Sequence, residues 1–91
     1  MNTIQHFVNG NKFSGESKRV GKVYNPATGE QSAEVNLAST KDVNEAVESA
    51  KIAFESWSNK PPLQRARVMF KFKELIEKNS DELTKIIVSE H

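Results

Sequence analysis

The spacing of apolar residues changes near residue 38. Up to that point apolar residues form short runs or alternate with polar ones, a pattern typical of half-buried strands. Beyond it they recur every three or four positions, which is the period of an amphipathic helix. The pattern predicts strands and turns in residues 1–38 and a three-helix segment in residues 39–91. The expected strands are residues 4–8, 11–13, 22–24 and 32–37.

Turn-forming residues separate these strands. Asn9-Gly10 is favoured in type I′ turns, because both central positions of that turn need a positive φ. We therefore expect residues 4–8 and 11–13 to form a hairpin. The polar residues 14–21 are expected to be a loop.

Residues 25–29, with the sequence Asn-Pro-Ala-Thr-Gly, are the next turn signal. Pro26 pushes Asn25 toward extended geometry, and Gly29 adopts a positive φ at little cost. A simple turn is the favoured interpretation, and a functional loop is the alternative. The strand that follows alternates around Ala33, Val35 and Leu37.

Capping residues and prolines mark the helix boundaries. Ser39 and Asp42 resemble a capping box in which Asp replaces Glu. Pro61-Pro62 ends the first helix, because proline lacks a backbone donor, and the second helix is expected over residues 63–78. Asn79 is expected to cap a third helix. The apolar stripe of the first helix comprises Val43, Ala46, Val47, Ala50, Ala53, Phe54 and Trp57.

Some apolar residues lie away from the main stripes. Ile52 falls on the polar side of the first helix, and Leu63, Ala66 and Phe70 form a second patch on the second helix. The third helix meets no Gly or Pro before residue 91. A large apolar side chain left exposed forgoes about 1.5–3 kcal/mol of burial. We therefore expect these patches to be covered by further protein, with this chain as the opening segment.

The composition excludes several functional classes. The 91 residues include no cysteine, which rules out disulfides, Cys-ligated metal sites and a thiolate nucleophile within this sequence. A net charge of +1 argues against nucleic-acid binding through a bulk positive field. No run approaches the roughly 20 apolar residues of a membrane span, and residues 1–10 do not resemble a signal peptide. We expect a cytoplasmic protein (of the mitochondrial matrix if eukaryotic) with neither nucleic acid nor membrane as partner.

Residue types suited to catalysis or binding are few. His6 and His91 are far apart in sequence and are interpreted as structural or surface residues rather than as ligands or bases. Basic residues of the second helix could bind phosphate, but Glu74 shares their face and is expected to pair with Lys78, so a solvated face is favoured. Arg65 instead falls within the apolar stripe, where it snorkels or pairs with a buried carboxylate. The basic residues are Arg65, Arg67, Lys71, Lys73 and Lys78.

Aromatic and thioether side chains recur at helical spacing on the first two helices. We interpret them as core residues rather than as a ligand-binding box; they are Phe54, Trp57, Met69 and Phe72. The sequence contains neither a glycine-rich phosphate loop nor a metalloprotease or EF-hand motif. We therefore assign no catalytic, cofactor-binding or metal-binding residue.

Several segments, in order, resemble the N-terminal region of the aldehyde dehydrogenase superfamily. The resemblance covers nearly the whole chain: residues 7–10, 23–30, 33–35, 42–57, 65–76, 81–83 and 89–90. Within the superfamily, residues 65–72 (Arg-Ala-Arg-Val-Met-Phe-Lys-Phe) are most similar to the CoA-acylating methylmalonate-semialdehyde dehydrogenase branch. The resemblance implies an α/β fold of which this chain is the N-terminal portion, the start of an NAD-binding domain truncated at its C-terminal end.

The resemblance also implies an activity for the full-length protein. It would be an NAD-dependent oxidoreductase of valine catabolism that converts malonate or methylmalonate semialdehyde to acetyl-CoA or propionyl-CoA, with CoA acylation and decarboxylation. Its chemistry would begin with a Cys thiolate, followed by hydride transfer to NAD and acyl transfer to CoA. A homodimer or homotetramer is implied.

None of the family's catalytic or cofactor-binding residues maps onto this sequence. The 91-residue chain alone is therefore expected to be an inactive scaffold whose partner is the remainder of its own polypeptide. Some family members hold a monovalent cation through backbone carbonyls beside the Asn-Pro turn, which here would be Val23 or Tyr24.

Two alternatives remain. The first is a hydrolytic, non-acylating NAD(P)-dependent aldehyde dehydrogenase, which shares most of this N-terminal pattern. The second, from another class, is a small protein-interaction module that uses its exposed apolar stripes as a binding surface.

Overall fold

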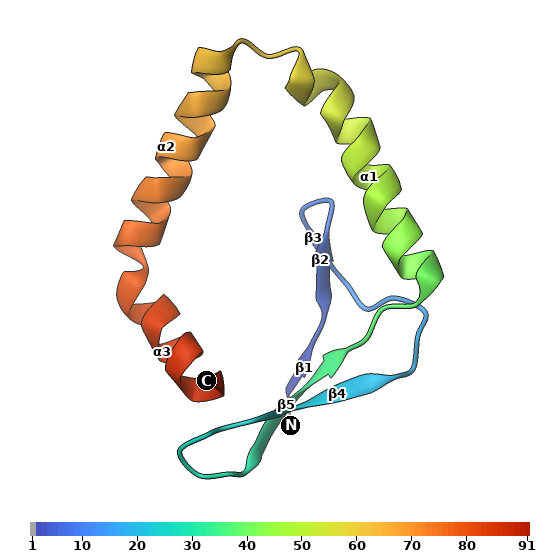
Figure 1. Cartoon of the computed structure of the whole chain (residues 1–91), viewed down its shortest axis with the longest axis vertical. Helices are drawn as coiled ribbons and strands as arrows, with labels where there is room; N and C mark the ends of the chain where they lie inside the picture. The colour runs from blue at the N-terminus through green and yellow to red at the C-terminus, as the bar shows by residue number, and fades with distance from the viewer. Residues whose placement is uncertain (1) are drawn as a thin grey trace.

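The computed structural model describes residues 2–91 as five strands followed by three helices (Figure 1). The strands are short, and the helices account for most of the second half of the chain, in agreement with the expected change of period. The elements are β1 (Asn2–Ile4), β2 (His6–Val8), β3 (Asn11–Phe13), β4 (Val20–Tyr24), β5 (Gln31–Asn36), α1 (Thr40–Ser58), α2 (Pro62–Lys78) and α3 (Ser80–Glu90).

The strands form two separate sheets. A three-stranded sheet has the order β1–β5–β4, with β1 parallel and β4 antiparallel to β5. Strands β2 and β3 form an antiparallel hairpin of their own. Its turn is the expected one, because Asn9 has a φ of 52° and Gly10 a φ of 76°.

The strand expected over residues 32–37 is shifted by one position, since β5 is Gln31–Asn36, and two further strand predictions are wrong in their boundaries. Residues 4–8 are not one strand: the chain breaks at Gln5, because β1 pairs with β5 whereas β2 pairs with β3. The expected loop over residues 14–21 ends early, because Val20 and Gly21 already pair with β5. Both differences arise from pairing with a strand distant in sequence, which a local pattern does not reveal.

The helix starts follow local capping rules at Ser39 but not at Asn79. Ser39 and Asp42 form a complete capping box at the start of α1, as predicted. The Asn79 side chain makes no cap for α3; its amide donates to the Leu75 carbonyl of α2 at 2.8 Å. The backbone of Leu83 donates to the Asn79 carbonyl at 3.0 Å, so α3 follows α2 almost without interruption.

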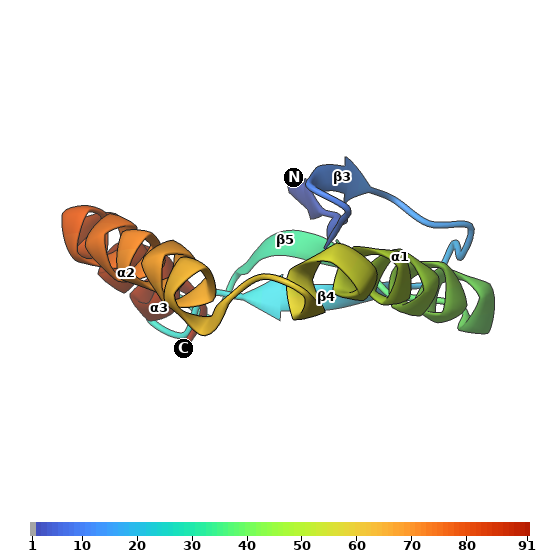
Figure 2. The same cartoon turned by 90° about the horizontal axis from the view of Figure 1, so that it is seen from above.

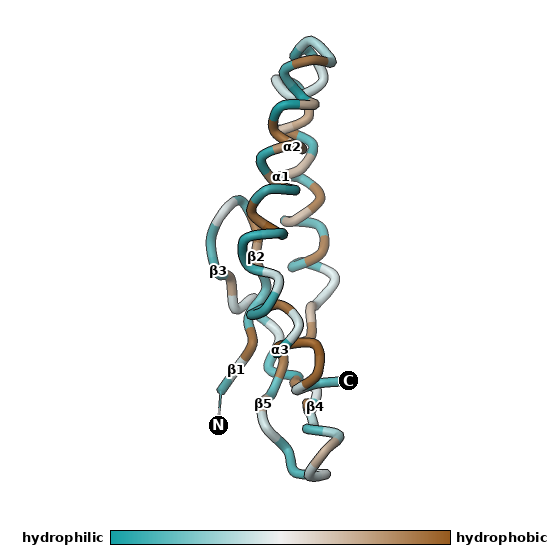
Figure 3. The backbone as a smooth tube through the Cα atoms, turned by 90° about the vertical axis from the view of Figure 1, so that its left-hand side faces the viewer, coloured by the Kyte–Doolittle hydropathy of each residue, from teal (hydrophilic) through white to brown (hydrophobic). Residues whose placement is uncertain are grey.

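The helices α1 and α2 form the two arms of an arch (Figure 1), and the β2–β3 hairpin lies to one side of the plane of the arch (Figures 2 and 3). Seen from above, the molecule is flat (Figure 2), with principal extents of 48 × 35 × 15 Å. Its radius of gyration is 16.8 Å, whereas a compact chain of this length would have about 12 Å. The solvent-accessible surface is 7616 Å², compared with about 5,300 Å² for a compact protein of this mass.

The open shape leaves almost no closed core. Within residues 2–91, only Ala33 and Asp42 are buried. Apolar positions recur along all three helices (Figure 3), and many of their side chains are exposed, among them Ile52, Leu63 and Phe70, which lie off the main stripes. These side chains are uncovered in this chain, and their burial against further protein stays a prediction. None of the helices in this described part is long and apolar enough to cross a membrane.

Candidate functional site

The two histidines lie in different elements and do not form a pair of ligands. The ring of His6, on β2, lies 6.1 Å from the Phe13 ring on β3, and its Nε2 atom is buried without a hydrogen-bond partner. His91 follows α3, and its backbone N–H donates to the Ile87 carbonyl at 2.9 Å. Nothing in the described range gathers three His, Cys, Asp or Glu side chains in a way that would hold a metal ion.

The basic residues of α2 form an exposed, internally paired face. Lys71 lies 3.4 Å from Glu74, and Lys73 lies 3.4 Å from Glu77. Glu74 thus pairs with Lys71, whereas the sequence predicted a pair with Lys78. On a helix a side chain is equally close to residues in the preceding and the following turn. Acidic residues interspersed with basic ones at this spacing support the interpretation as a solvated face. Arg65 differs from the others, since its Nε atom is buried without a partner.

The expected aromatic core is not formed within this chain. Phe54, Met69 and Phe72 are all more than half exposed, and they lie on different arms of the arch. These residues lie on helices as predicted, but residues 2–91 supply no surface for them to pack against.

Residues 25–29 form a turn closed by local hydrogen bonds. The Asn25 side chain accepts the Ala27 N–H at 2.9 Å, and the Asn25 carbonyl accepts the Gly29 N–H at 2.7 Å. The Asn25 amide is therefore engaged in the turn itself, which supports the turn interpretation. The Val23 carbonyl next to it accepts the Ser32 hydroxyl at 3.4 Å. A cation bound at Val23 or Tyr24 stays a prediction.

A buried carboxylate, Asp42, joins the loop after β3 to the start of α1. Its two oxygens accept the backbone N–H groups of Glu16, at 3.0 Å, and Ser39, at 2.9 Å. The Ser39 hydroxyl accepts the Asp42 N–H at 3.1 Å and donates to a Glu16 carboxylate oxygen at 3.2 Å. Gly15 makes this approach possible, since a Cβ there would overlap the Asp42 carboxylate. This cluster of Gly15, Glu16, Ser39 and Asp42 is called the Asp42 latch below.

The hydrogen bonds of the Asp42 latch favour the charged carboxylate. The backbone N–H of Ser39, opposed by burial and assisted by the N–H of Glu16, lowers the pKa of Asp42 below its ordinary value. The latch therefore holds a carboxylate that remains ionised, and the hydroxyl of Ser39 beside it is engaged by the Asp42 N–H and the Glu16 carboxylate. It is a structural feature rather than a catalytic one. The sequence had indicated its Ser39–Asp42 half, whereas Gly15 and Glu16 carried no signal beyond a glycine in a polar loop.

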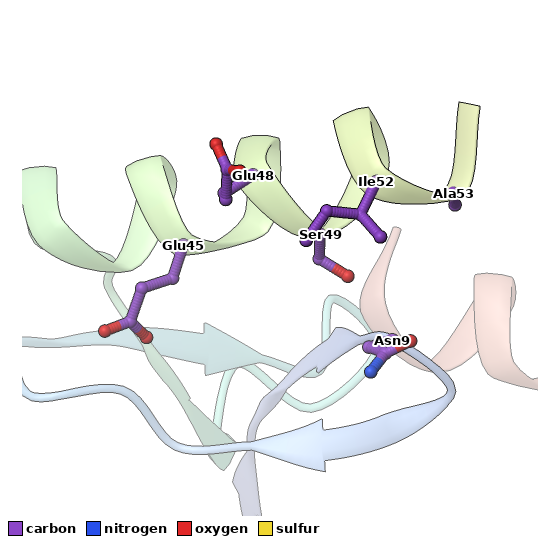
Figure 4. A pocket seen from close by; sticks show the side chains of 6 residues that line it. All are labelled: Asn9, Glu45, Glu48, Ser49, Ile52 and Ala53. Carbon is purple, nitrogen blue, oxygen red and sulfur yellow. The ribbon is translucent and has the colours of Figure 1, made fainter. Parts of the chain in front are cut away.

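A groove lies between α1 and the tip of the β2–β3 hairpin (Figure 4). It has a volume of about 440 Å³ and is lined by Asn9, Glu45, Glu48, Ser49, Ile52 and Ala53. Its floor is apolar and its rim carries two carboxylates. In Figure 4 the Glu48 carboxylate points away from the hairpin, leaving Ser49 and Ile52 nearest to Asn9.

Comparison with known proteins relates the chain to one family. A model of the aldehyde dehydrogenase family matches residues 13–91. A malonate-semialdehyde dehydrogenase of Pseudomonas aeruginosa is 40% identical over 91 residues, covering all of this chain and 18% of that protein. One from Bacillus cereus is 42% identical over 88 residues, covering 97% of this chain and 18% of that protein.

Two solved structures share the fold along its whole length. The methylmalonate-semialdehyde dehydrogenase of Oceanimonas doudoroffii is 50% identical with a TM-score of 0.95. A Sinorhizobium meliloti protein assigned the same activity, in complex with NAD, is 44% identical with a TM-score of 0.97. In both cases the match covers 100% of this chain and 18% of the other. The chain thus spans about a fifth of the length of its relatives, and it belongs to the aldehyde dehydrogenase family.

Proposed function

We propose that this chain serves as the N-terminal part of an NAD-dependent, CoA-acylating malonate- or methylmalonate-semialdehyde dehydrogenase. The observation that carries the proposal is the full-length correspondence with the Oceanimonas doudoroffii enzyme, at 50% identity and a TM-score of 0.95. The relatives named malonate-semialdehyde dehydrogenases support malonate semialdehyde as one of the two substrates.

The role proposed for the segment is that of a scaffold. Its apolar helix faces are exposed along an open arch, so they are available to pack against other parts of a longer polypeptide. The Asp42 latch joins the strand region to α1, so that both would be presented as one unit. We further propose a cytoplasmic location and a homodimeric or homotetrameric enzyme.

The proposed reaction oxidises the aldehyde by hydride transfer to NAD and transfers the resulting acyl group to CoA, with decarboxylation. A thiolate nucleophile suits such an acyl transfer, because a thioester is formed and exchanged between two sulfur atoms. This sequence contains no cysteine. In the proposal the nucleophile and the groups that bind NAD and CoA therefore belong to the remainder of the polypeptide.

The test uses a polypeptide of the relatives' length that begins with this sequence. It is supplied with methylmalonate or malonate semialdehyde and NAD, with and without CoA, and NADH formation and acyl-CoA products are measured. The proposal expects NADH formation together with propionyl-CoA or acetyl-CoA. A free carboxylic acid formed at the same rate without CoA would instead establish the hydrolytic alternative. No NADH formation from either semialdehyde would overturn the assignment of substrate.

A further inference from the structure

The turn of the β2–β3 hairpin is also a chemically distinctive residue pair. Of the eight asparagines in the sequence, only Asn9 is followed by a glycine. The backbone nitrogen that follows an asparagine can attack the carbon of its side-chain amide, and a glycine leaves that nitrogen free of crowding by a Cβ. The pair that forms the turn is therefore the pair best suited, by sequence, to such an attack.

Both reacting groups are free of other partners in the folded chain. Asn9 is exposed at the tip of the hairpin, beside the groove that faces α1 (Figure 4). Within residues 2–91, neither the side-chain amide of Asn9 nor the backbone N–H of Gly10 makes a hydrogen bond. A Cβ at Gly10 would meet nothing within 4 Å, so the space around this residue is open. Attack of the Gly10 nitrogen on the Asn9 amide therefore does not compete with another hydrogen bond of either group.

The other asparagines are less suited to the reaction because of their contacts or their positions. Asn44 lies inside α1, where the next backbone N–H is committed to a helical hydrogen bond. Asn2 precedes Thr3, whose branched Cβ crowds the attacking nitrogen. The remaining five use the side-chain amide in a hydrogen bond with the backbone, so the fold adds to the selectivity for Asn9. These five are Asn11, Asn25, Asn36, Asn59 and Asn79.

The side chain of Asn11 supports the attacking nitrogen. Its amide donates to the Asn9 carbonyl at 3.1 Å. This carbonyl belongs to the same peptide group as the Gly10 N–H, so it shares the negative charge that develops when the nitrogen loses its proton. A donor already placed at that oxygen stabilises this charge. Asn11 therefore acts through the Gly10 peptide as a positioning residue.

We propose that Asn9 is a site of spontaneous deamidation, assisted by Asn11. The Gly10 nitrogen gives up its proton and bonds to the Asn9 Cγ, closing a cyclic succinimide. The bond from Cγ to Nδ2 breaks, and Nδ2 takes up a proton and leaves as ammonia. Water then opens the ring: cleavage at Cγ gives aspartate, and cleavage at the Asn9 backbone carbonyl carbon gives isoaspartate. The balance is one water consumed and one ammonia released, with no change of oxidation state.

The modification changes the charge at the groove. Either product places a carboxylate at the tip of the hairpin, where Glu45 and Glu48 already line the groove. Isoaspartate also adds a carbon to the backbone of a turn in which residue number and φ angles are closely specified. This inference goes beyond the scaffold role and does not rest on the proposed enzymatic activity.

The test follows every asparagine of the sequence in one sample. A polypeptide of the relatives' length that begins with this sequence is incubated in mildly alkaline buffer and digested at acidic pH. Mass spectrometry that distinguishes aspartate from isoaspartate measures the products. Conversion at Asn9 is expected to be about tenfold faster, or more, than at any other asparagine of residues 1–91, with both products formed. Conversion no faster than at the others, or aspartate without isoaspartate, would overturn the proposal.

Unfolding in urea separates the contribution of the fold from that of the sequence. Asn79 precedes another small residue, Ser80, but its amide is held by the Leu75 carbonyl at 2.8 Å. In urea that contact is lost, so conversion at Asn79 is expected to rise about tenfold or more, whereas conversion at Asn9 should change much less. Equal acceleration at the two sites would show that the fold protects Asn9 and would contradict the proposal.

Variants at position 11 test the assistance by Asn11. Asn11→Ala removes the donor to the Asn9 carbonyl and is expected to slow conversion about fivefold, the effect of one hydrogen bond. Asn11→Asp keeps the shape of the side chain but replaces the donor by an acceptor, and should slow conversion at least as much. Asn36→Ala is the matched control, because it removes the same kind of bond, to the Ser14 carbonyl at 3.2 Å, and should leave conversion at Asn9 unchanged. An unchanged rate in both variants at position 11, or an equal loss in Asn36→Ala, would overturn the role of Asn11.

Discussion

The carboxylate of Asp42 accepts the backbone N–H of Glu16 at 3.0 Å, joining two residues that are 26 positions apart. The same carboxylate also accepts the backbone N–H of Ser39 and so completes the capping box of α1. Asp42 therefore makes a long-range and a local hydrogen bond at once. A single side chain therefore both starts α1 and fixes the loop that follows the hairpin.

Replacing Asp42 with Asn should loosen this loop. An amide offers only one acceptor oxygen, so its NH₂ group would face one of the two N–H donors that the carboxylate now satisfies. Hydrogen exchange measured residue by residue is expected to accelerate at the Glu16 and Ser39 amides by about tenfold or more. The amides of α2 serve as the internal control, and equal acceleration there would indicate global rather than local loosening.

Acidification should weaken the same contact. The pKa of Asp42 is lowered in the folded chain relative to the ordinary value of about 3.9. At a pH near these values the folded chain therefore binds fewer protons at Asp42 than the unfolded chain does. Its contribution to stability is present above that value and is lost as the pH falls through the lowered pKa. Urea titrations at decreasing pH should show a smaller loss of stability in Asp42→Asn than in the unaltered chain. Parallel losses in the two proteins would assign the acid sensitivity to other carboxyls.

Gly15→Ala should be more harmful than Gly10→Ala, although both glycines have a φ of 76°. The shared positive φ costs about 1 kcal/mol with an alanine at either position. At Gly10 a Cβ meets nothing within 4 Å, whereas at Gly15 it overlaps the Asp42 carboxylate. We expect an additional loss of about 1–2 kcal/mol for Gly15→Ala in urea unfolding. Equal losses would mean that the latch moves aside at no cost.

The 91-residue chain alone should neither bind NAD nor oxidise aldehydes. Its grooves offer no glycine-rich phosphate site, and its sequence contains no cysteine. Isothermal titration calorimetry with NAD is expected to show no binding heat beyond dilution, and NADH formation should stay at background. Millimolar or tighter binding of NAD would contradict the scaffold role.

The sequence by itself determined the elements whose signals are local. Asn9-Gly10 specifies its turn because only a few residue types tolerate two consecutive positive φ values. Ser39 and Asp42 specify the start of α1 because both hydrogen bonds of the capping box lie within four residues. The helical period predicted the second helix over residues 63–78, and α2 spans Pro62–Lys78. The family resemblance was present in the same local motifs.

Only the tertiary structure decided how these elements are joined. The break at Gln5 exists because β1 pairs with β5, about thirty residues later, while β2 pairs with its immediate neighbour β3. The need for a glycine at position 15 follows only from the fold, which places the Asp42 carboxylate where a Cβ would lie. Asn79, a good cap by composition, donates instead to the Leu75 carbonyl because α3 follows α2 without a free helix end. In each case the contacting group is distant in sequence or already makes another hydrogen bond. The free energy of such contacts depends on how the groups are arranged in space, which the residues adjacent in sequence do not determine.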